Sequence, residues 1–257
     1  MSARPAGALF IDDGGRGHPP VVFLHSLAGN ASQWSAQLEH VRAERRAIAL
    51  EFRGHARSGR PDDGDYSVAG YTADIAAAVD GTRLDRFVLV GHSMGAAVAA
   101  AYAAANPRRV RGLVLVDGAF ARETPTREER AWLRDLGGER YRELIDGHWR
   151  AILEGSRPDV RSRVLADLRA TRRETVVASF RALVDHDPIP AIRRFPGPKL
   201  LVLSDIGDIP QAAHRHVEGL PHELVRGTGH WLQMDRPDRF NALLDAFLAH
   251  TDLGGDR

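Results

Sequence analysis

The sequence contains no cysteine, a single lysine (Lys199) and almost no net charge. Without cysteine the chain can form neither a disulfide framework nor a thiol nucleophile, and this composition fits a reducing compartment. The 35 basic and 34 acidic residues give a formal net charge of +1. A balanced charge gives no sign of nucleic acid or an anionic membrane surface as a partner. Disulfide-rich folds and nucleic-acid binding are therefore not expected.

Long apolar runs are also missing. The longest, residues 96–105, is far shorter than the roughly 20 residues that a membrane-spanning helix needs. Residues 1–5 lead into no apolar core of a signal peptide, so we expect a cytoplasmic protein without a membrane partner. A chain of 257 residues, 43% of them hydrophobic, can bury one large core, which predicts a single domain over residues 1–257, monomeric or homodimeric.

Short apolar runs alternate with segments of helical spacing in the first 118 residues. The expected strands are residues 9–11, 21–24, 47–51, 87–90 and 113–117, and the expected helices are residues 32–41, 68–79 and 96–105. Strict alternation of strand and helix is typical of a parallel sheet with helices on both faces. The sequence therefore predicts an α/β fold with a mostly parallel, doubly wound sheet.

The alternation stops after Gly118. Residues 126–187 contain no strand pattern but four amphipathic helical segments, at 127–136, 139–154, 158–170 and 173–186. We expect these segments to form a helical cap, over residues 119–195, inserted between two strands of the core. The sheet then resumes at residues 199–203, followed by a helix at 211–217, a strand at 222–225 and a helix at 237–250.

The run Gly91-His92-Ser93-Met94-Gly95 joins a β-branched strand directly to an alanine-rich helix. Gly-x-Ser-x-Gly alone is expected by chance in about one chain in ten of this composition. Its position between strand and helix is much more specific, because a serine on such a sharp turn projects its hydroxyl above the strand end. Side chains at Gly91 and Gly95 would collide where strand and helix pass close together. Ser93 is therefore a candidate nucleophile.

Together with other loops, this turn makes the chain resemble the α/β-hydrolase fold family along almost its whole length. The matching pieces are His25-Ser26-Leu27, the loop 53–59, the turn 91–95, the loop 205–208 and Gly229-His230. The resemblance implies a catalytic triad in the chain order serine, acid, histidine. It also implies that the backbone N–H groups of Leu27 and Met94 form an oxyanion hole.

A neutral serine needs a base to remove its proton, and that base needs a carboxylate to fix its tautomer. Among the twelve histidines, His230 is preferred because it lies in a glycine-containing loop after the last expected strand and matches the family's histidine. Asp208, five residues past the strand end at Leu203, matches the family's acid. Asp205 and Asp117 remain alternatives.

The oxyanion loop departs from the usual His-Gly pattern, because it reads His25-Ser26. A serine at this place resembles enol-lactone hydrolases and makes Ser26 a possible extra donor to substrate. Trp132, Trp149 and Phe180 could line an apolar substrate pocket, although each also fits the core of the cap. The histidines at 214, 216 and 222 have no acidic residues at ligand spacing, so we expect no metal.

These features predict a cofactor-free serine hydrolase that cleaves small-molecule carboxylic esters or lactones through an acyl-enzyme. The same constellation serves carbon–carbon bond hydrolysis, perhydrolysis and enol-lactone hydrolysis, and fold alone does not separate these reactions. A ligand-binding sensor with slow turnover is an alternative from another class of protein, because four cap helices are compatible with it.

Overall fold

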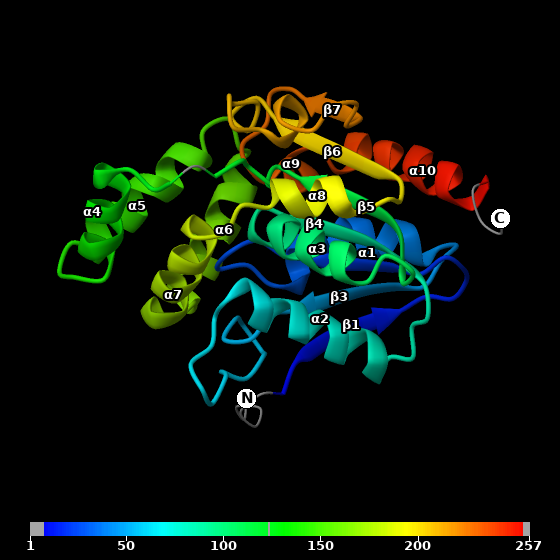
Figure 1. Ribbon diagram of the computed structural model, residues 1–257, viewed down its shortest axis with the longest axis horizontal. Coiled ribbons are helices and arrows are strands. Elements are labelled where there is room, and N and C mark those ends of the chain that lie inside the picture. The colour runs from blue at the N-terminus through cyan, green and yellow to red at the C-terminus, as the bar shows by residue number, and fades with distance from the viewer. Residues whose placement is uncertain (1–7, 123, 254–257) are drawn as a thin grey trace.

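A seven-stranded sheet organises the protein (Figure 1). The structure is a computed structural model that describes residues 8–122 and 124–253. Within these ranges the strands lie in the order β1-β3-β2-β4-β5-β6-β7. Their bounds are β1 (Phe10–Gly14), β2 (Val21–Leu24), β3 (Ala47–Glu51), β4 (Phe87–His92), β5 (Val110–Val116), β6 (Lys199–Ser204) and β7 (His222–Val225). Strand β1 is antiparallel to β3 and every other neighbouring pair is parallel, which confirms the predicted sheet.

The central strands are apolar throughout because both faces of the sheet are covered. Successive side chains of a strand point to opposite faces. In β2, Val21 and Phe23 belong to one apolar cluster, whereas Val22 and Leu24 belong to the other. Such strands appear in the sequence as continuous apolar runs, since neither face meets water.

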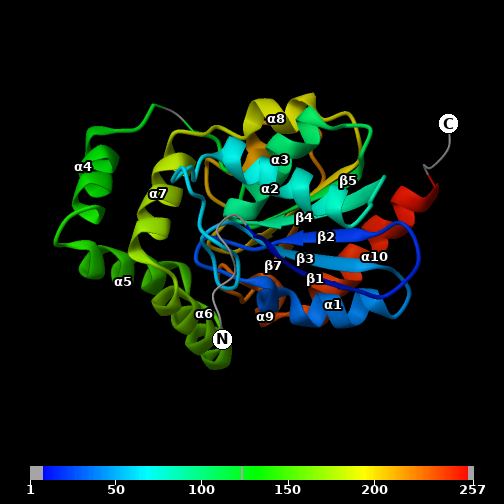
Figure 2. The same ribbon diagram turned by 90° about the horizontal axis from the view of Figure 1, so that it is seen from below.

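Helices form a layer on each side of the sheet (Figure 2). Helices α2 (Val68–Gly81), α3 (Met94–Ala105) and α8 (Ile189–Arg194) cover one face. The other face is covered by α1 (Ser35–Arg42), α9 (Leu232–Asp235) and α10 (Pro237–Leu253). None of the helices in the described ranges is long and apolar enough to cross a membrane.

Four further helices occupy the chain between β5 and β6 and lie together beyond one end of the sheet (Figures 1 and 2). They are α4 (Arg127–Leu136), α5 (Tyr141–Ile152), α6 (Pro158–Ala170) and α7 (Arg173–Val184), here called the inserted helices. Their starts follow from local chemistry. Thr126 and Glu129 form a capping box at the start of α4. Pro158 is the first residue of α6, where a backbone N–H would have no partner within the helix.

Three contacts show that the inserted helices lie over the carboxyl ends of the parallel strands. The loop after β2 contacts α6 through Gln33 and Asp167, whose side chains are 3.0 Å apart. The loop after β7 contacts α5, because the His230 N–H donates to the carbonyl oxygen of Ile152 at 2.9 Å. Thr175 of α7 lies against the loop after β3, where its hydroxyl donates to the carbonyl oxygen of Gly54. The loops at this edge of an open sheet are where such folds place their chemistry.

Two local expectations were wrong. The predicted helix over residues 211–217 is only a 3₁₀ turn, η2 (Ala213–Arg215). Helix α8 was not among the expected helices, and it carries Pro188 at its N-cap and Pro190 in its first turn. Both prolines lie at the start of α8, where the first N–H groups of a helix have no partner within it, so proline is tolerated there.

Candidate active site

Ser93 lies on the sharp turn between β4 and α3. Its backbone is in a strained conformation with φ 53° and ψ −113°, and its N–H donates to the carbonyl oxygen of Val116 at 2.8 Å. Only glycine fits two residues before and two residues after Ser93. A Cβ at Gly95 would lie 2.6 Å from the carbonyl oxygen of Leu24, and one at Gly91 would overlap the backbone of Gly95. The structure therefore places Ser93 as the sequence pattern predicts.

A glycine from the neighbouring strand also abuts the turn. A Cβ on Gly118, which follows β5, would lie 2.7 Å from both the Cα and the carbonyl oxygen of Ser93. The end of β5 is thereby held directly against the turn that carries Ser93. Sequence reasoning did not assign Gly118 a role, although a glycine two residues after the neighbouring strand was the available signal.

His230 lies in the loop after β7 and points to the same edge of the sheet. Its Nδ1 is 2.7 Å from Oδ2 of Asp117, and its side chain is 11% exposed. Because a carboxylate only accepts hydrogen bonds, Nδ1 carries the proton, and Nε2 is left as the basic nitrogen. The His230 ring packs on the ring of His92, with centroids 4.7 Å apart, so His230 lies beside the residue that precedes Ser93.

Asp117, at the end of β5, is fully buried and has donors on both carboxylate oxygens. The N–H of Ser204 donates to Oδ1 at 2.7 Å, and the Ser204 hydroxyl donates to Oδ2 at 2.8 Å. Gly207 packs so closely that a Cβ there would overlap Oδ1. Asp117 also has a φ of 41°, which is strained for a residue other than glycine. These constraints fix the carboxylate toward His230.

The expected pairing of His230 with Asp208 is therefore wrong. The Asp208 carboxylate accepts a hydrogen bond from Arg215 at 2.6 Å and lies 3.5 Å from Nε2 of His214. The rival Asp205 accepts from the backbone N–H of Gly227. Both carboxylates are satisfied within their own surroundings. Ser204 and Gly207 at the start of the β6 loop pack against Asp117, whereas the Asp208 carboxylate further along the loop pairs with Arg215.

The histidine loop is fixed by a second buried carboxylate, Asp235, that sequence reasoning missed. Its Oδ2 accepts from the Gly229 N–H and from the Ser156 hydroxyl, each at 3.1 Å. Its Oδ1 accepts from the Arg157 N–H at 2.8 Å. These bonds join the residue before His230 to the connection between α5 and α6. The position of His230 thus depends on the inserted helices.

The loop after β2 carries the expected oxyanion-hole residue Leu27. The Leu27 N–H donates to no protein acceptor in the described part of the chain, and the Met94 N–H, first in α3, has no partner within its helix. Gly95 packs against the carbonyl oxygens of Leu24 and His25, which brings this loop beside the start of α3. Both candidate donors therefore belong to the same edge of the sheet as Ser93.

The buried ring of His25 holds this loop in place. Its Nδ1 is 2.7 Å from the carbonyl oxygen of Ser26, and its Nε2 is 3.0 Å from the backbone nitrogen of Phe52. One nitrogen donates and the other accepts, which requires a neutral ring. Complete burial lowers the pKa of His25 to about 4, in agreement with that arrangement.

Ser26, the expected extra donor, is only 2% exposed, and its hydroxyl donates to Oε1 of Gln33 at 3.2 Å. Gln33 also accepts from the indole N–H of Trp231 at 3.2 Å and donates to Asp167 of α6 at 3.0 Å. One buried amide thereby connects the oxyanion loop, the residue after His230 and an inserted helix. No sequence signal identified Gln33, because its three partners are distant along the chain.

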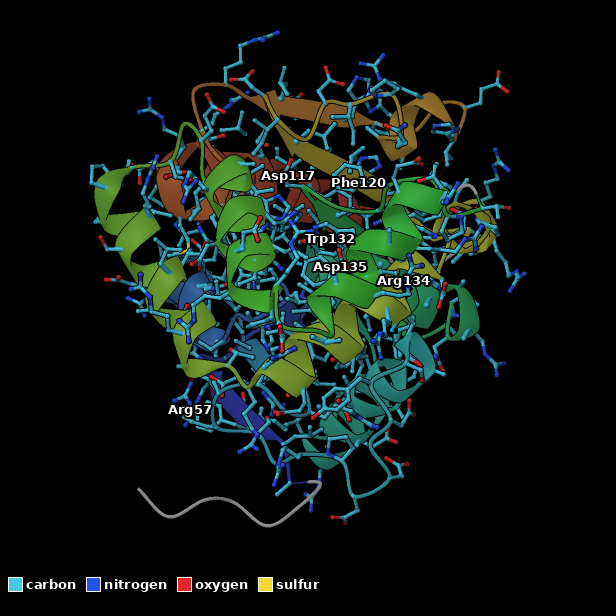
Figure 3. All side chains as sticks on the ribbon, turned by 90° about the vertical axis from the view of Figure 1, so that its left-hand side faces the viewer. Arg57, Asp117, Phe120, Trp132, Arg134 and Asp135 are labelled. Atoms are coloured by element: carbon cyan, nitrogen blue, oxygen red, sulfur yellow. The ribbon has the colours of Figure 1, made fainter. Side chains whose placement is uncertain are left out.

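The aromatic residues expected to line a pocket form a cluster on the inserted helices. The ring of Phe180 lies 5.2 Å from that of Trp132 and 6.0 Å from that of Trp149, measured between centroids. Trp149 is 2% exposed, whereas Trp132 and Phe180 are half-buried. His148 lies among them and was not singled out from the sequence. In the view onto the inserted helices, Asp117 and Trp132 both lie toward the centre of the molecule (Figure 3).

Two other histidines near the site are structural. Nε2 of His92 lies 2.8 Å from the carbonyl oxygen of His230, and burial keeps the pKa of His92 well below its usual range. His55 is buried beside His25, and burial lowers the pKa of His55 to about 3. Neither ring bonds to Asp117. In the described residues, moreover, no three metal-ligating side chains come together, and His214 instead stacks on His222 with centroids 4.2 Å apart.

A cavity of ≈ 360 Å³ opens between the inserted helices α4 and α7 and the loops after β5 and β6. Phe120, three residues after Asp117, forms part of its wall, and the two residues lie next to each other in the view of Figure 3. The remaining wall includes Arg122, Glu129, Val184, Ile209 and Gln211. The aromatic cluster does not line this cavity. The cavity and the aromatic cluster are therefore two distinct regions of the inserted helices.

Comparison with known proteins identifies the family. The model of the alpha/beta hydrolase family matches residues 21–243, and the chain belongs to that family. A 2-hydroxymuconate semialdehyde hydrolase from Pseudomonas putida is 30% identical over 95% of this chain and 88% of its own length. Other curated relatives match over only 30–38% of their length.

Solved structures agree on the fold. A thermophilic esterase from Thermogutta terrifontis superposes with a TM-score of 0.83 at 22% identity, covering 95% of this chain and 93% of the esterase. An enol-lactonase from Burkholderia xenovorans LB400 gives a TM-score of 0.80 at 20% identity, over 94% of this chain and 96% of that protein. At such identities the likeness shows the fold alone.

Proposed function

We propose that this protein is a serine hydrolase that cleaves small-molecule carboxylic esters or lactones through an acyl-enzyme on Ser93. The observation that carries the proposal is the hydrogen bond from His230 to the buried Asp117 carboxylate, beside the strained turn of Ser93. Asp117 is joined through Gly118 to that turn, so the base and the nucleophile belong to one packed unit. A serine hydroxyl becomes a competent nucleophile only beside such an oriented base.

The first half of the reaction forms the acyl-enzyme. The Ser93 oxygen attacks the carbonyl carbon of the ester, and its proton passes to Nε2 of His230. Asp117 stabilises the imidazolium that forms without taking its proton. The tetrahedral intermediate then collapses, the bond from carbon to the alkoxy oxygen breaks, and His230 returns the proton to the departing alcohol.

The second half regenerates the enzyme. Water attacks the acyl carbon, gives a proton to His230, and the bond between that carbon and the Ser93 oxygen breaks as the serine regains a proton. In both halves the developing negative charge is on the former carbonyl oxygen. The N–H groups of Leu27 and Met94 would receive it, and the start of α3 adds the positive end of a helix dipole.

The inserted helices serve as the cap in this proposal. They are joined to the histidine loop through Asp235 and to the oxyanion loop through Gln33. A small substrate would therefore bind between the carboxyl edge of the sheet and these helices. The esterase and enol-lactonase structures with the same fold are consistent with ester or lactone substrates.

The test is the variant Ser93→Ala, assayed with 4-nitrophenyl esters and lactones of graded chain length. Loss of the nucleophile is expected to lower kcat/KM by about 10⁴-fold or more. Ser162→Ala, at an exposed serine on α6, is the matched control and is expected to be as active as the parent. Undiminished ester hydrolysis by Ser93→Ala would refute the nucleophile assignment.

Hydrolysis of a carbon–carbon bond is a second candidate, and the relative from Pseudomonas putida favours it. The same serine, histidine and carboxylate would act, but the leaving group would be a carbon atom. Assay of 2-hydroxymuconate semialdehyde alongside the esters separates the two. We expect the higher kcat/KM with esters or lactones, and the reverse order would assign carbon–carbon hydrolysis instead.

A further inference from the structure

His148 is a polar side chain within the aromatic cluster of the inserted helices. Its imidazole ring lies 5.3 Å from the ring of Phe180, 5.5 Å from that of Trp149 and 5.9 Å from that of Trp132, measured between centroids. Within the described residues, neither ring nitrogen has a hydrogen-bonding partner in the protein, and the side chain is half-buried. The ring nitrogens are not among the buried atoms that lack a partner, so they are accessible to a polar atom of a ligand.

His148 lies one turn of α5 before the residue that contacts the His230 loop. The carbonyl oxygen of Ile152 accepts the hydrogen bond from the His230 N–H at 2.9 Å. His148 lies four residues before Ile152 in the same α-helix, and residues four apart share one face of a helix. The two histidines are also close enough that the charge of His230 helps to lower the pKa of His148.

The same surroundings keep His148 neutral. Burial, with a smaller effect from His230, lowers the pKa of His148 to about 4. At neutral pH the ring therefore offers one N–H donor and one nitrogen acceptor. In this largely aromatic cluster the ring can recognise either kind of polar atom, whereas the indoles of Trp132 and Trp149 can only donate and Phe180 offers no hydrogen bond.

We propose that His148 hydrogen-bonds a polar atom in the alcohol part of the substrate, a few bonds beyond the ester oxygen. This inference rests on the proposed function. In that mechanism His230 protonates the departing alcohol, so the alcohol part must lie on the His230 side of the site. The substrate is thus an ester whose alcohol part carries a further oxygen atom. If the substrate is a lactone, its ring carries that further oxygen near the alkoxy oxygen.

Three butanoate esters of equal heavy-atom count test this assignment. Butyl butanoate has a plain alkyl alcohol, 2-methoxyethyl butanoate replaces one methylene by an acceptor oxygen, and 3-hydroxypropyl butanoate replaces the terminal methyl by a hydroxyl. Release of butanoic acid is followed by titration at constant pH. The measured quantity is the ratio of kcat/KM for each polar ester to that for the butyl ester.

His148→Phe keeps a flat ring among the aromatic side chains but removes both polar atoms. It is expected to lower the ratio for the polar esters by about 3- to 10-fold, the effect of one hydrogen bond, while kcat/KM for butyl butanoate stays within about 3-fold. His148→Gln retains a donor and an acceptor and is expected to keep most of the preference. His250→Phe, at an exposed histidine at the end of α10, is the matched control.

The outcomes separate this inference from the proposed function. A ratio that is the same in His148→Phe and the parent enzyme would overturn the role of His148 while leaving Ser93 chemistry intact. If the parent enzyme hydrolyses neither these three esters nor the esters and lactones of the Ser93→Ala test, the proposed function itself fails. Circular dichroism checks each variant, and His148→Leu replaces the phenylalanine variant if that one does not fold.

Discussion

The loops after β5 and β6 both carry aspartate at the same edge of the sheet, yet only one of them reaches His230. Asp117, directly after β5, is fully buried and bonds to His230 and Ser204. Asp208, in the loop after β6, is exposed and pairs with Arg215. The difference shows that donors and packing around a carboxylate, rather than its distance along the chain from a strand, decide which acid orients the histidine.

Ser204 explains much of this difference. It is the last residue of β6, the strand beside β5, and both its N–H and its hydroxyl donate to Asp117. Its hydroxyl also accepts from the Gly207 N–H at 3.1 Å, so the start of the β6 loop folds around the Asp117 carboxylate. The acid of the proposed triad is thus held by β5 and supported by β6.

The largest loss of activity is expected from Asp117→Asn. An asparagine amide next to Nδ1 favours the tautomer whose Nε2 carries the proton, and that nitrogen can no longer accept the serine proton. We expect kcat/KM for ester hydrolysis to fall by about 10³- to 10⁴-fold, as for carboxylates of other triads. Steady-state kinetics on 4-nitrophenyl butanoate measures the loss. A variant with parental activity would remove Asp117 from the proposed triad.

A smaller effect is expected from Ser204→Ala. The substitution removes one donor from Oδ2 of Asp117 but leaves the backbone N–H on Oδ1 and the bond to His230. Because the charge-assisted hydrogen bond to Oδ2 is lost together with the one accepted from the Gly207 N–H, we expect kcat/KM to fall about 10-fold and the free energy of unfolding to drop by about 1.5–3 kcal/mol. Kinetics and urea denaturation measure the two. Ser204→Thr, which retains a hydroxyl, is the matched comparison, and equal activity of parent and alanine variant would contradict this role.

The smallest effect is expected from Asp208→Asn. It weakens only a partly exposed pairing with Arg215, so the free energy of unfolding is expected to change by less than about 1 kcal/mol. Ester hydrolysis is expected to stay at the parental rate. A large loss of activity here, together with an active Asp117→Asn, would reverse the comparison and restore Asp208 as the acid.

Much of the fold followed from local patterns in the sequence. Glycines flank the turn at Ser93, and the strand before it and the helix after it predicted that larger residues would collide there. Helices α4 and α6 begin and end where the amphipathic spacing predicted. Each of these features depends on neighbouring residues, because capping, helical periodicity and tight turns are decided within a few positions.

Features that depend on distant residues were missed. Gln33 joins Ser26, Trp231 and Asp167, and Asp235 joins the histidine loop to the inserted helices. The role proposed for His148 likewise depends on the contact between α5 and the His230 loop. No spacing along the chain encodes such contacts, since they arise when separate elements pack together.

The amino-acid sequence by itself determined the family, the strand and helix alternation and the strained position of Ser93, because these depend on short-range sterics and apolar periodicity. Only the tertiary structure decided that Asp117, and not Asp208, is the partner of His230. Parallel strands bring several loop carboxylates to one edge of the sheet, and the packing of Ser204 and Gly207 around one of them selects it.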